Sequence, residues 1–236
     1  MKKVLLFSLG AVLLLAPGAN SYFSSTATNQ NNTLSASSNF GSTPTPAPQT
    51  NHIVISEVQI DGGTGQANDN DFIELYNPTN NPISLSGHRL VKRTGSSPND
   101  TNIFTFTTQS VPARGFFLWA NSGFSSTIGA DVSSSDTLAS NNSIALRNGT
   151  VNTGIIVDAL SWNSASTSLK EGTEFSPNPG INESMERKAY STSTTSTMTG
   201  SDTDKGNGYD SDKNSADFVL RLTSQPQNSS SPTESP

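Results

Sequence analysis

The chain of 236 residues contains no cysteine. This absence excludes disulfide bonds, thiolate metal ligands, cysteine nucleophiles and a lipid anchor attached through cysteine. Histidine is almost as scarce, because only His52 and His88 occur, and neither lies in a His-x-x-His or Gly-x-Ser-x-Gly context. Zinc sites and Ser-His-Asp triads need a positioned imidazole. We therefore interpret both histidines as surface or packing residues and predict that the protein has no catalytic residue and is not an enzyme.

Positive charge is also in short supply. The chain has 13 lysines and arginines against 19 aspartates and glutamates, a formal net charge of −6 at pH 7. Such a chain repels phosphate backbones, and no basic stripe interleaved with aromatic residues is present. We predict no nucleic-acid partner.

Long apolar runs are absent beyond the amino terminus. There, two lysines precede an apolar run over residues 4–16, and small residues then precede Tyr22, an order typical of a secretory signal peptide. The run is shorter than the roughly 20 residues of a membrane-spanning helix. We predict that residues 1–21 are a signal peptide and that the mature chain is secreted, either extracellular or at the cell surface, without stable membrane insertion. A retained membrane anchor is the alternative.

Two segments are rich in serine, threonine, asparagine and proline and almost free of aliphatic residues. They cover residues 22–51 and 223–236. Such segments cannot bury enough apolar surface to fold alone. We predict a disordered linker and a disordered Ser/Pro-rich tail on either side of one domain, residues 52–222.

Within that domain the hydrophobic pattern has the period of a β-strand. The first run places Ile53, Ile55 and Val58 on one face, with a bulge near Glu57. Later runs are bounded by Gly, Pro, Asn or Ser clusters: DFIELYN, NIFTFT, GFFLWAN, NSIALRN, IIVDALSW and ADFVLRL. Several short runs of this kind predict an all-β sandwich or barrel with almost no helix.

Turn residues support the same prediction. In NPTNNPISLSG the chain should reverse after Tyr76 and return to a sheet at Ile83. The pair Asn148 and Gly149 between two β-like runs indicates a hairpin.

Taken in order, IVISEVQI, DFIELYNPTNNPISLSG, VPARGFFLWAN, SIALRNG and VDALSW resemble the lamin tail domain family. The resemblance continues through SMERK, which ends at Lys188, and DKNSADF, which ends at Phe218. It implies an immunoglobulin-like antiparallel β-sandwich. His88 stands where the family commonly has tryptophan, which puts the packing of that corner in question.

A second resemblance follows the signal peptide. SYFSSTATNQNNTLSA is similar to the region around the cleavage site of camelysin-like and biofilm-fibre proteins, although Ser25 replaces their aspartate. This resemblance implies export through a dedicated bacterial signal peptidase.

Two carboxylates, Glu57 and Glu74, recur in the first two strands and could in principle act as a general acid and base. We favour a structural interpretation, in which each faces solvent or pairs across the sheet with a cation. The candidate cations are Arg89, Lys92 and Arg93.

An acidic segment begins at Gly200 and ends at Phe218, and it is the best candidate for a small-ligand site. It combines asparagine and glycine with five aspartates: Asp202, Asp204, Asp210, Asp212 and Asp217. Calcium takes six to eight oxygen ligands from flexible loops, but the spacing departs from the EF-hand pattern. We assign no cofactor or metal residue, and a calcium ion bound by this segment stays the alternative to a solvated acidic loop.

The aromatic residues Phe116, Phe117, Trp119 and Trp162 suit either a core or an exposed platform for a carbohydrate or peptide. We favour the core.

These observations leave three hypotheses open. The leading one is a non-catalytic binding or adhesive module at the cell surface or in extracellular matrix, with a protein or glycan partner and contacts through strand edges or loops. The second is a structural subunit that assembles through its amino-terminal segment and forms oligomers. The third is an accessory domain that works with a separate secreted hydrolase.

Overall fold

The computed structural model describes residues 50–60, 70–95, 97–162 and 169–235, and two short strands nearer the amino terminus. The chain divides into two units, Met1–Thr45 and Pro46–Pro236. In the first unit β1 (Ala27–Asn29) pairs antiparallel with β2 (Asn32–Leu34). The predicted signal peptide and most of the predicted linker lie outside the described residues. No helix in the described part of the chain is long and apolar enough to cross a membrane.

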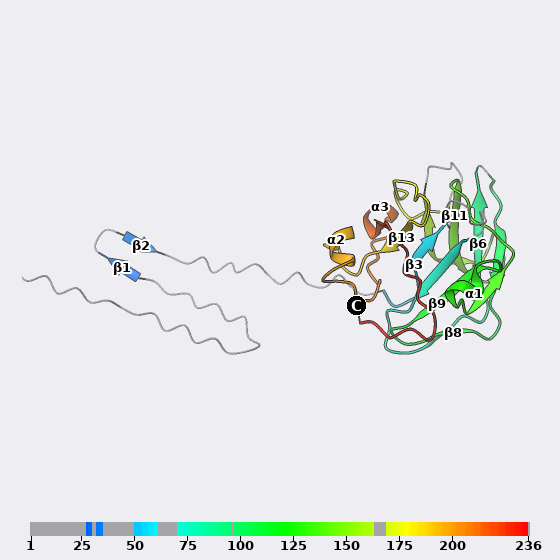
Figure 1. Cartoon of the computed structure of the whole chain (residues 1–236), viewed down its shortest axis with the longest axis horizontal. Coiled ribbons are helices and arrows are strands. Elements are labelled where there is room, and N and C mark those ends of the chain that lie inside the picture. Colours follow the sequence, from blue (N-terminus) through cyan, green and yellow to red (C-terminus); the bar gives the residue numbers. More distant parts are fainter. Residues whose placement is uncertain are drawn as a thin grey trace, which may run out of the picture. The chain divides into compact units, whose positions relative to one another are not determined.

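The second unit contains two main sheets (Figure 1). The larger has the strand order β10-β9-β4-β3-β13-β14, and its neighbours are antiparallel except for β10 and β9. Its strands are β3 (Val54–Gln59), β4 (Phe72–Tyr76), β9 (Phe116–Asn121), β10 (Val132–Ser134), β13 (Ser184–Arg187) and β14 (Phe218–Arg221).

The smaller main sheet has the antiparallel order β12-β11-β6-β7. Its strands are β6 (His88–Thr94), β7 (Thr101–Thr105), β11 (Asn142–Asn148) and β12 (Ile155–Ser161). A two-stranded ladder joins β5 (Ile83–Ser84) to β8 (Ser110–Val111). The helices are single turns: α1 (Ser125–Ile128), α2 (Thr195–Met198) and α3 (Asn214–Asp217). The predicted all-β antiparallel sandwich is confirmed.

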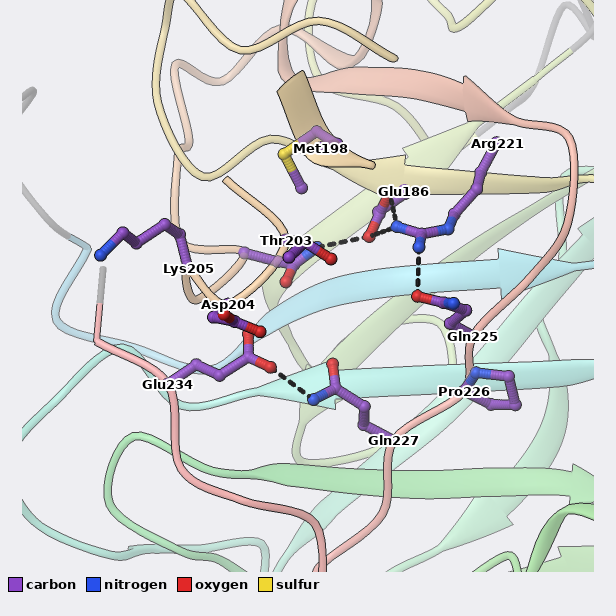
Figure 2. Close-up of a pocket in the computed structure, with 11 residues that line it drawn as sticks. Glu186, Met198, Thr203, Asp204, Lys205, Arg221, Gln225, Pro226, Gln227 and Glu234 are labelled. Atoms are coloured by element: carbon purple, nitrogen blue, oxygen red, sulfur yellow. Dashed lines mark hydrogen bonds and ion pairs between the residues drawn. The ribbon is translucent and has the colours of Figure 1, made fainter. Parts of the chain in front are cut away.

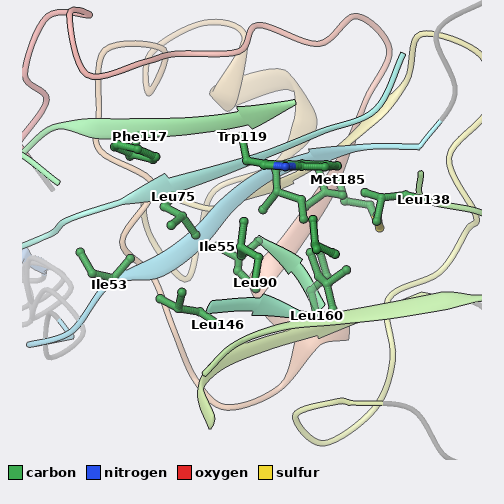
Figure 3. Close-up of a cluster of buried hydrophobic side chains, with 14 of the residues drawn as sticks. Ile53, Ile55, Leu75, Leu90, Phe117, Trp119, Leu138, Leu146, Leu160 and Met185 are labelled. Atoms are coloured by element: carbon green, nitrogen blue, oxygen red, sulfur yellow. The ribbon is translucent and has the colours of Figure 1, made fainter. Parts of the chain in front are cut away.

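The core lies between the two main sheets (Figure 3). Side chains alternate along each strand, so every second residue faces the opposite sheet. The larger sheet contributes Ile55, Leu75 and Trp119, and the smaller contributes Leu146 and Leu160, all fully buried. Burying an aliphatic side chain of this size contributes about 1.5–3 kcal/mol.

The predicted core face of the first strand is also confirmed. Ile53, Ile55 and Val58 join the main core, and the pairing of β3 with β4 shifts register between Ile55 and Glu57, where we predicted a bulge. The bulge lets Ile55 and Val58 face the same side although they are three residues apart.

Both predicted turns occur. Asn77 organises the first, because its Nδ2 donates to the carbonyls of Asn81 and Pro112 while its Oδ1 accepts from the backbone of Thr79. The chain then enters the short β5 strand at Ile83. The second turn joins β11 to β12 as a hairpin whose loop begins at Gly149, with φ at +107°.

The aromatic residues serve the core. Phe117, Trp119 and Trp162 lie in the main cluster, and Phe116 packs on Tyr76 on the other face of the larger sheet. The indole nitrogen of Trp162 donates to the carbonyl of Ala139 at 3.2 Å. The alternative of an exposed aromatic platform is therefore wrong.

The carboxyl-terminal segment departs from our prediction of a disordered tail. Residues 223–235, red in Figure 1, are hydrogen-bonded to the larger sheet. The backbone of Gln225 donates to Glu57 on β3, that of Gln227 donates to Glu74 on β4, and that of Ser229 donates to Asp131. The prediction failed because composition measures apolar burial, whereas backbone N–H groups hold this segment on acceptors that the sheet provides.

Deleting residues 224–236 should lower the free energy of unfolding by about 1–3 kcal/mol. A hydrogen bond to a charged acceptor contributes about 1.5–3 kcal/mol, and the entropy of ordering the segment offsets part of this. Urea denaturation measures the loss, and hydrogen exchange should show protected amides at Gln225 and Gln227. Unprotected amides together with unchanged stability would restore the prediction of a disordered tail.

Candidate functional site

Strand β13 links two polar clusters on opposite faces of the larger sheet. Because successive side chains point to opposite faces, Met185 lies in the main core and Arg187 points to the same side. Glu186 faces the other way and pairs with Arg221 on β14. We call the first cluster the inner ion cluster (Arg187, Asp158, Asp210, Asp217 and Glu171) and the second the glutamate row (Glu186, Glu57 and Glu74).

The inner ion cluster joins the two main sheets. Nη2 of Arg187 donates to both carboxylate oxygens of Asp158 on β12, at 2.8 and 2.7 Å. Nε of Arg187 donates to the carbonyl of Ile55 at 2.8 Å, and the backbone N–H of Ile55 donates to Asp158. Arg187 and Asp158 are fully buried, so this charge-assisted pair is shielded from water.

Further carboxylates surround the same guanidinium. Asp210 lies 3.2 Å from Nη1 of Arg187 and 3.5 Å from Nε2 of His52. Burial works to raise the pKa of Asp210, but the hydrogen bond from His52 and the charge of Arg187 outweigh it and lower the pKa to about 2. Burial, followed by the charge of Asp158, raises the pKa of Glu171 to about 9. Glu171 is therefore protonated near neutral pH.

This arrangement bears on metal binding. Asp158, Glu171 and Asp210 bring carboxylate oxygens within 4.8 Å of one another, which is close enough to share a cation. The guanidinium of Arg187 already supplies positive charge to two of these three residues. The cluster is thus an ion-pair network with a cation of its own.

The five aspartates of residues 200–218, for which a bound calcium ion was the alternative to a solvated loop, lie at several separate places in the fold. Asp210 belongs to the inner ion cluster, and Asp217 lies 3.9 Å from Arg187 while it accepts from Ser211. Asp202 accepts from Ser193 at 2.9 Å and makes no hydrogen bond with that cluster within the described part of the chain. The other two aspartates are exposed: Asp204 and Asp212. The segment is therefore a solvated acidic loop only in part, because Asp210 and Asp217 are bound within the fold.

The glutamate row crosses three neighbouring strands. Glu57 lies directly opposite Glu186 on β13 and Glu74 on β4 in the register of the sheet. All three glutamates are buried. Our prediction that Glu57 and Glu74 face solvent or pair with Arg89, Lys92 or Arg93 is wrong, because those residues lie on β6 in the other sheet. There Lys92 pairs with Asp136 and Arg93 with Asp100.

Hydrogen-bond donors offset only part of the cost of burying the three carboxylates of the glutamate row. Ser184 donates to Glu57 and Ser56 donates to Glu74, at 2.5 and 2.6 Å. Burial and the charge of Glu186 raise the pKa of Glu57 to about 7, and burial and the charge of Glu57 raise the pKa of Glu74 well above its usual value. Buried carboxylates in direct register destabilise one another's charged forms.

A polar pocket opens beside Glu186 where the carboxyl-terminal segment crosses the row (Figure 2). Its cavity is about 330 Å³. A second cavity of about 470 Å³ adjoins it along β14 and shares Thr203, Arg221 and Gln225 with it. The first is lined by Glu186, Met198, Thr203, Asp204, Lys205, Asn207, Arg221, Gln225, Pro226, Gln227 and Glu234. This lining holds three carboxylates but neither an imidazole nor a thiol.

Comparison with known families agrees with this architecture. The Lamin Tail Domain model matches residues 46–164. The chain belongs to the lamin tail domain family. Its β-sandwich is therefore immunoglobulin-like, and the family is one of non-catalytic domains. No curated protein gives a significant match.

The matched range ends before β13 and β14. The inner ion cluster, the glutamate row and the polar pocket all depend on these later strands. The two histidines stay apart, with His52 on Asp210 and His88 at the start of β6. The absence of a catalytic residue remains a prediction.

Sequence reasoning missed Arg187 and its partner Asp158. One signal was available in SMER. Its adjacent charged residues, Glu186 and Arg187, point to opposite faces of a strand, and at least one face of a strand in a sandwich is buried. One of the two must then enter the interior, where a charge needs a partner. The sequence did not identify that partner, which lies on the other sheet.

Replacing Arg187 by methionine should lower the free energy of unfolding by about 3–5 kcal/mol, because it leaves Asp158 buried without its cation. Urea denaturation at pH 7 measures the change. Lys170→Met is the matched control, since the Lys170 and Glu174 pair is partly exposed and should cost less than about 1 kcal/mol. Equal effects of the two variants would contradict the structural role of Arg187.

The pKa of Glu57 predicts a pH dependence of stability. Its pKa in the folded protein is about 7, above the 4.5 of an ordinary glutamate. The folded state therefore binds the proton more tightly, and this contribution to stability, present below pH 4.5, is lost as the pH rises through 7. Glu57→Gln should remove this loss, so that its advantage over wild type grows between pH 5 and pH 8 by on the order of 3 kcal/mol. Denaturation curves that keep the same separation at both pH values would refute this.

Proposed function

We propose that this chain is an exported, non-catalytic binding module that engages a protein partner at the cell surface or in the extracellular matrix through the open edge of β12. The observation that carries the proposal is the exposure of Ile155 and Ile156, which are 75% and 42% exposed at the start of an edge strand. Exposed apolar side chains next to unpaired strand backbone are the features that an added β-strand recognises.

Only the first part of β12 is open. Further along, the side chain of Asn214 accepts from the backbone of Ser161 and donates to the carbonyl of Ala159, and the backbone of Phe175 donates to Ser161. These contacts cover the carboxyl-terminal half of the edge. Between Ile155 and Val157, no backbone hydrogen bond joins the outer side of the strand to another residue in the described ranges.

The open part is held rigidly by a buried carboxylate. Asp100 accepts from Nε of Arg93 and Nε of Arg147, each at 2.6 Å, and from the backbone of Asn152 in the hairpin loop. Arg147 also donates to the carbonyl of Gly154, one residue before β12. A strand edge fixed in this way loses little conformational entropy when a partner binds.

Export and the lack of catalysis rest on separate observations. The amino-terminal pattern of residues 1–21 supports secretion. Membership of a family of non-catalytic domains supports a binding role. The purified chain should be inactive against nucleic acid, ester and glycan substrates, and turnover that survives Glu74→Gln would contradict the non-catalytic part of the proposal.

Replacing Ile155 and Ile156 together by aspartate should abolish binding of extended peptides selected against the wild-type mature chain from a random library. Two charges at the edge oppose its burial under an added strand. Fluorescence anisotropy of the selected peptides measures affinity, and a loss of at least tenfold is expected.

Ile181→Asp is the matched control, because Ile181 is 48% exposed and lies in a turn that is not part of β12. It should bind the peptides as wild type does. Peptides that bind the double variant and wild type equally would exclude the β12 edge as the binding surface.

The same edge supports a second function, that of a structural subunit. A neighbouring copy could add a strand from its amino-terminal segment beside Ile155. Light scattering on the mature chain separates the two functions. Oligomers that dissociate on the double aspartate substitution and on deletion of residues 22–50 would favour the subunit, whereas a monomer leaves the binding module.

A further inference from the structure

The polar pocket presents hydrogen-bond acceptors without partners. Asn207 is 4% exposed, and its Nδ2 donates to the carbonyl of Arg187 and to Glu186. Its Oδ1 accepts from no residue in the described part of the chain. Gln227 also has an acceptor without a partner. Its Nε2 donates to Glu234 at 2.7 Å, and its Oε1 accepts no hydrogen bond from a described residue.

The orientation of these amides is fixed by chemistry. A carbonyl or a carboxylate can only accept, so the atoms of Asn207 and Gln227 that face Arg187 and Glu234 must be nitrogens. The oxygens therefore point elsewhere. Gln225 has the opposite orientation, since its Oε1 accepts from Arg221 and its Nε2 remains as a donor.

The charges of the pocket are unequal. Arg221 is committed to Glu186, donating to both of its oxygens at 2.6 Å, and its Nε donates to the carbonyl of Thr223. Asp204 and Glu234 lie together at the other end, and Figure 2 shows the ammonium of Lys205 directed away from them. Burial, with the charge of Asp204 adding to it, raises the pKa of Glu234.

A ligand that suits this lining donates several hydrogen bonds, carries positive charge and is small. The guanidinium group has five N–H donors in a planar fork and no acceptor. An ammonium group has three N–H donors on a single nitrogen. Such a compact group reaches acceptors on different sides of a cavity less well than a guanidinium does. The cavity of about 330 Å³ lies at the lower end of the range of about 300–1,000 Å³ for small-ligand sites.

We propose that this pocket binds the guanidinium group of an arginine in an extended segment of a partner protein, between Asp204, Glu234 and the free oxygens of Asn207 and Gln227. The site is separate from the β12 edge and does not depend on it. The adjoining cavity along β14 takes the residue next to the arginine. Hydroxyl groups of Thr195 and Thr199 and the exposed side chain of Leu222 line this cavity, and they suit a backbone with an aliphatic side chain.

Isothermal titration of the mature chain with capped peptides tests the proposal. The probe is a Gly-Leu-Arg-Gly peptide with both ends blocked. The comparison peptides replace arginine by citrulline, which keeps the shape and removes the charge, or by lysine. The arginine peptide should bind at least tenfold more tightly than either, and its affinity should fall as salt rises.

Variants locate the site. Glu234→Gln and Asp204→Asn should each weaken the arginine peptide at least fivefold. Asp212→Asn is the matched control, because it removes the same charge from an exposed residue outside the pocket and asparagine tolerates its φ of +55°. It should leave the affinity unchanged, and melting curves should show that all three variants are folded.

Several outcomes would overturn the proposal. Equal binding of the arginine and citrulline peptides would remove the role of charge, and equal binding of arginine and lysine would remove the role of the planar fork. Equal weakening by Asp212→Asn would show attraction to the acidic chain as a whole. Binding of a neutral oligosaccharide such as chitotetraose, with no binding of the arginine peptide, would assign the pocket to a glycan.

Discussion

The ion pair between Arg187 and Asp158 fixes how the two sheets of this sandwich lie against each other. Hydrophobic side chains tolerate small slips between sheets, but a fully buried guanidinium does not, because any slip leaves a charge without its partner in a medium of low dielectric constant. The same guanidinium holds the carbonyl of Ile55, and Asp158 accepts from its backbone N–H. Strands β3, β12 and β13 are therefore held in one fixed arrangement.

The outer face of the larger sheet carries buried carboxylates that need hydrogen-bond donors. Glu186, Glu57 and Glu74 put three carboxylates in register on a face that is covered. The partners of these glutamates are backbone N–H groups, serine hydroxyls and one arginine rather than apolar side chains. A segment rich in serine and proline is well suited to this, because it offers donors without adding hydrophobic surface. The polar pocket is lined by this segment on one side and by residues 203–205 on the other.

Local features of the fold could be predicted from the sequence, and long-range partners could not. The alternation of Ile53, Ile55 and Val58 and the turn at Asn148 and Gly149 are encoded by neighbouring residues. Which sheet a strand joins is decided by the whole chain, so Glu57 was assigned cations that lie on the opposite sheet. Composition likewise could not show that residues 223–235 find acceptors on strands more than 150 positions earlier in the chain.

The extent of the family match has a practical consequence for anyone dissecting this protein. A fragment ending at residue 164 would keep the ten strands from β3 to β12. It would lose β13 and β14, which lie along one edge of β3. Strand β3 would become an unprotected edge strand, and Asp158 would stay behind without its guanidinium. Such a fragment should be recovered as aggregate, and the smallest unit suitable for crystallisation or display extends through the segment that follows β14.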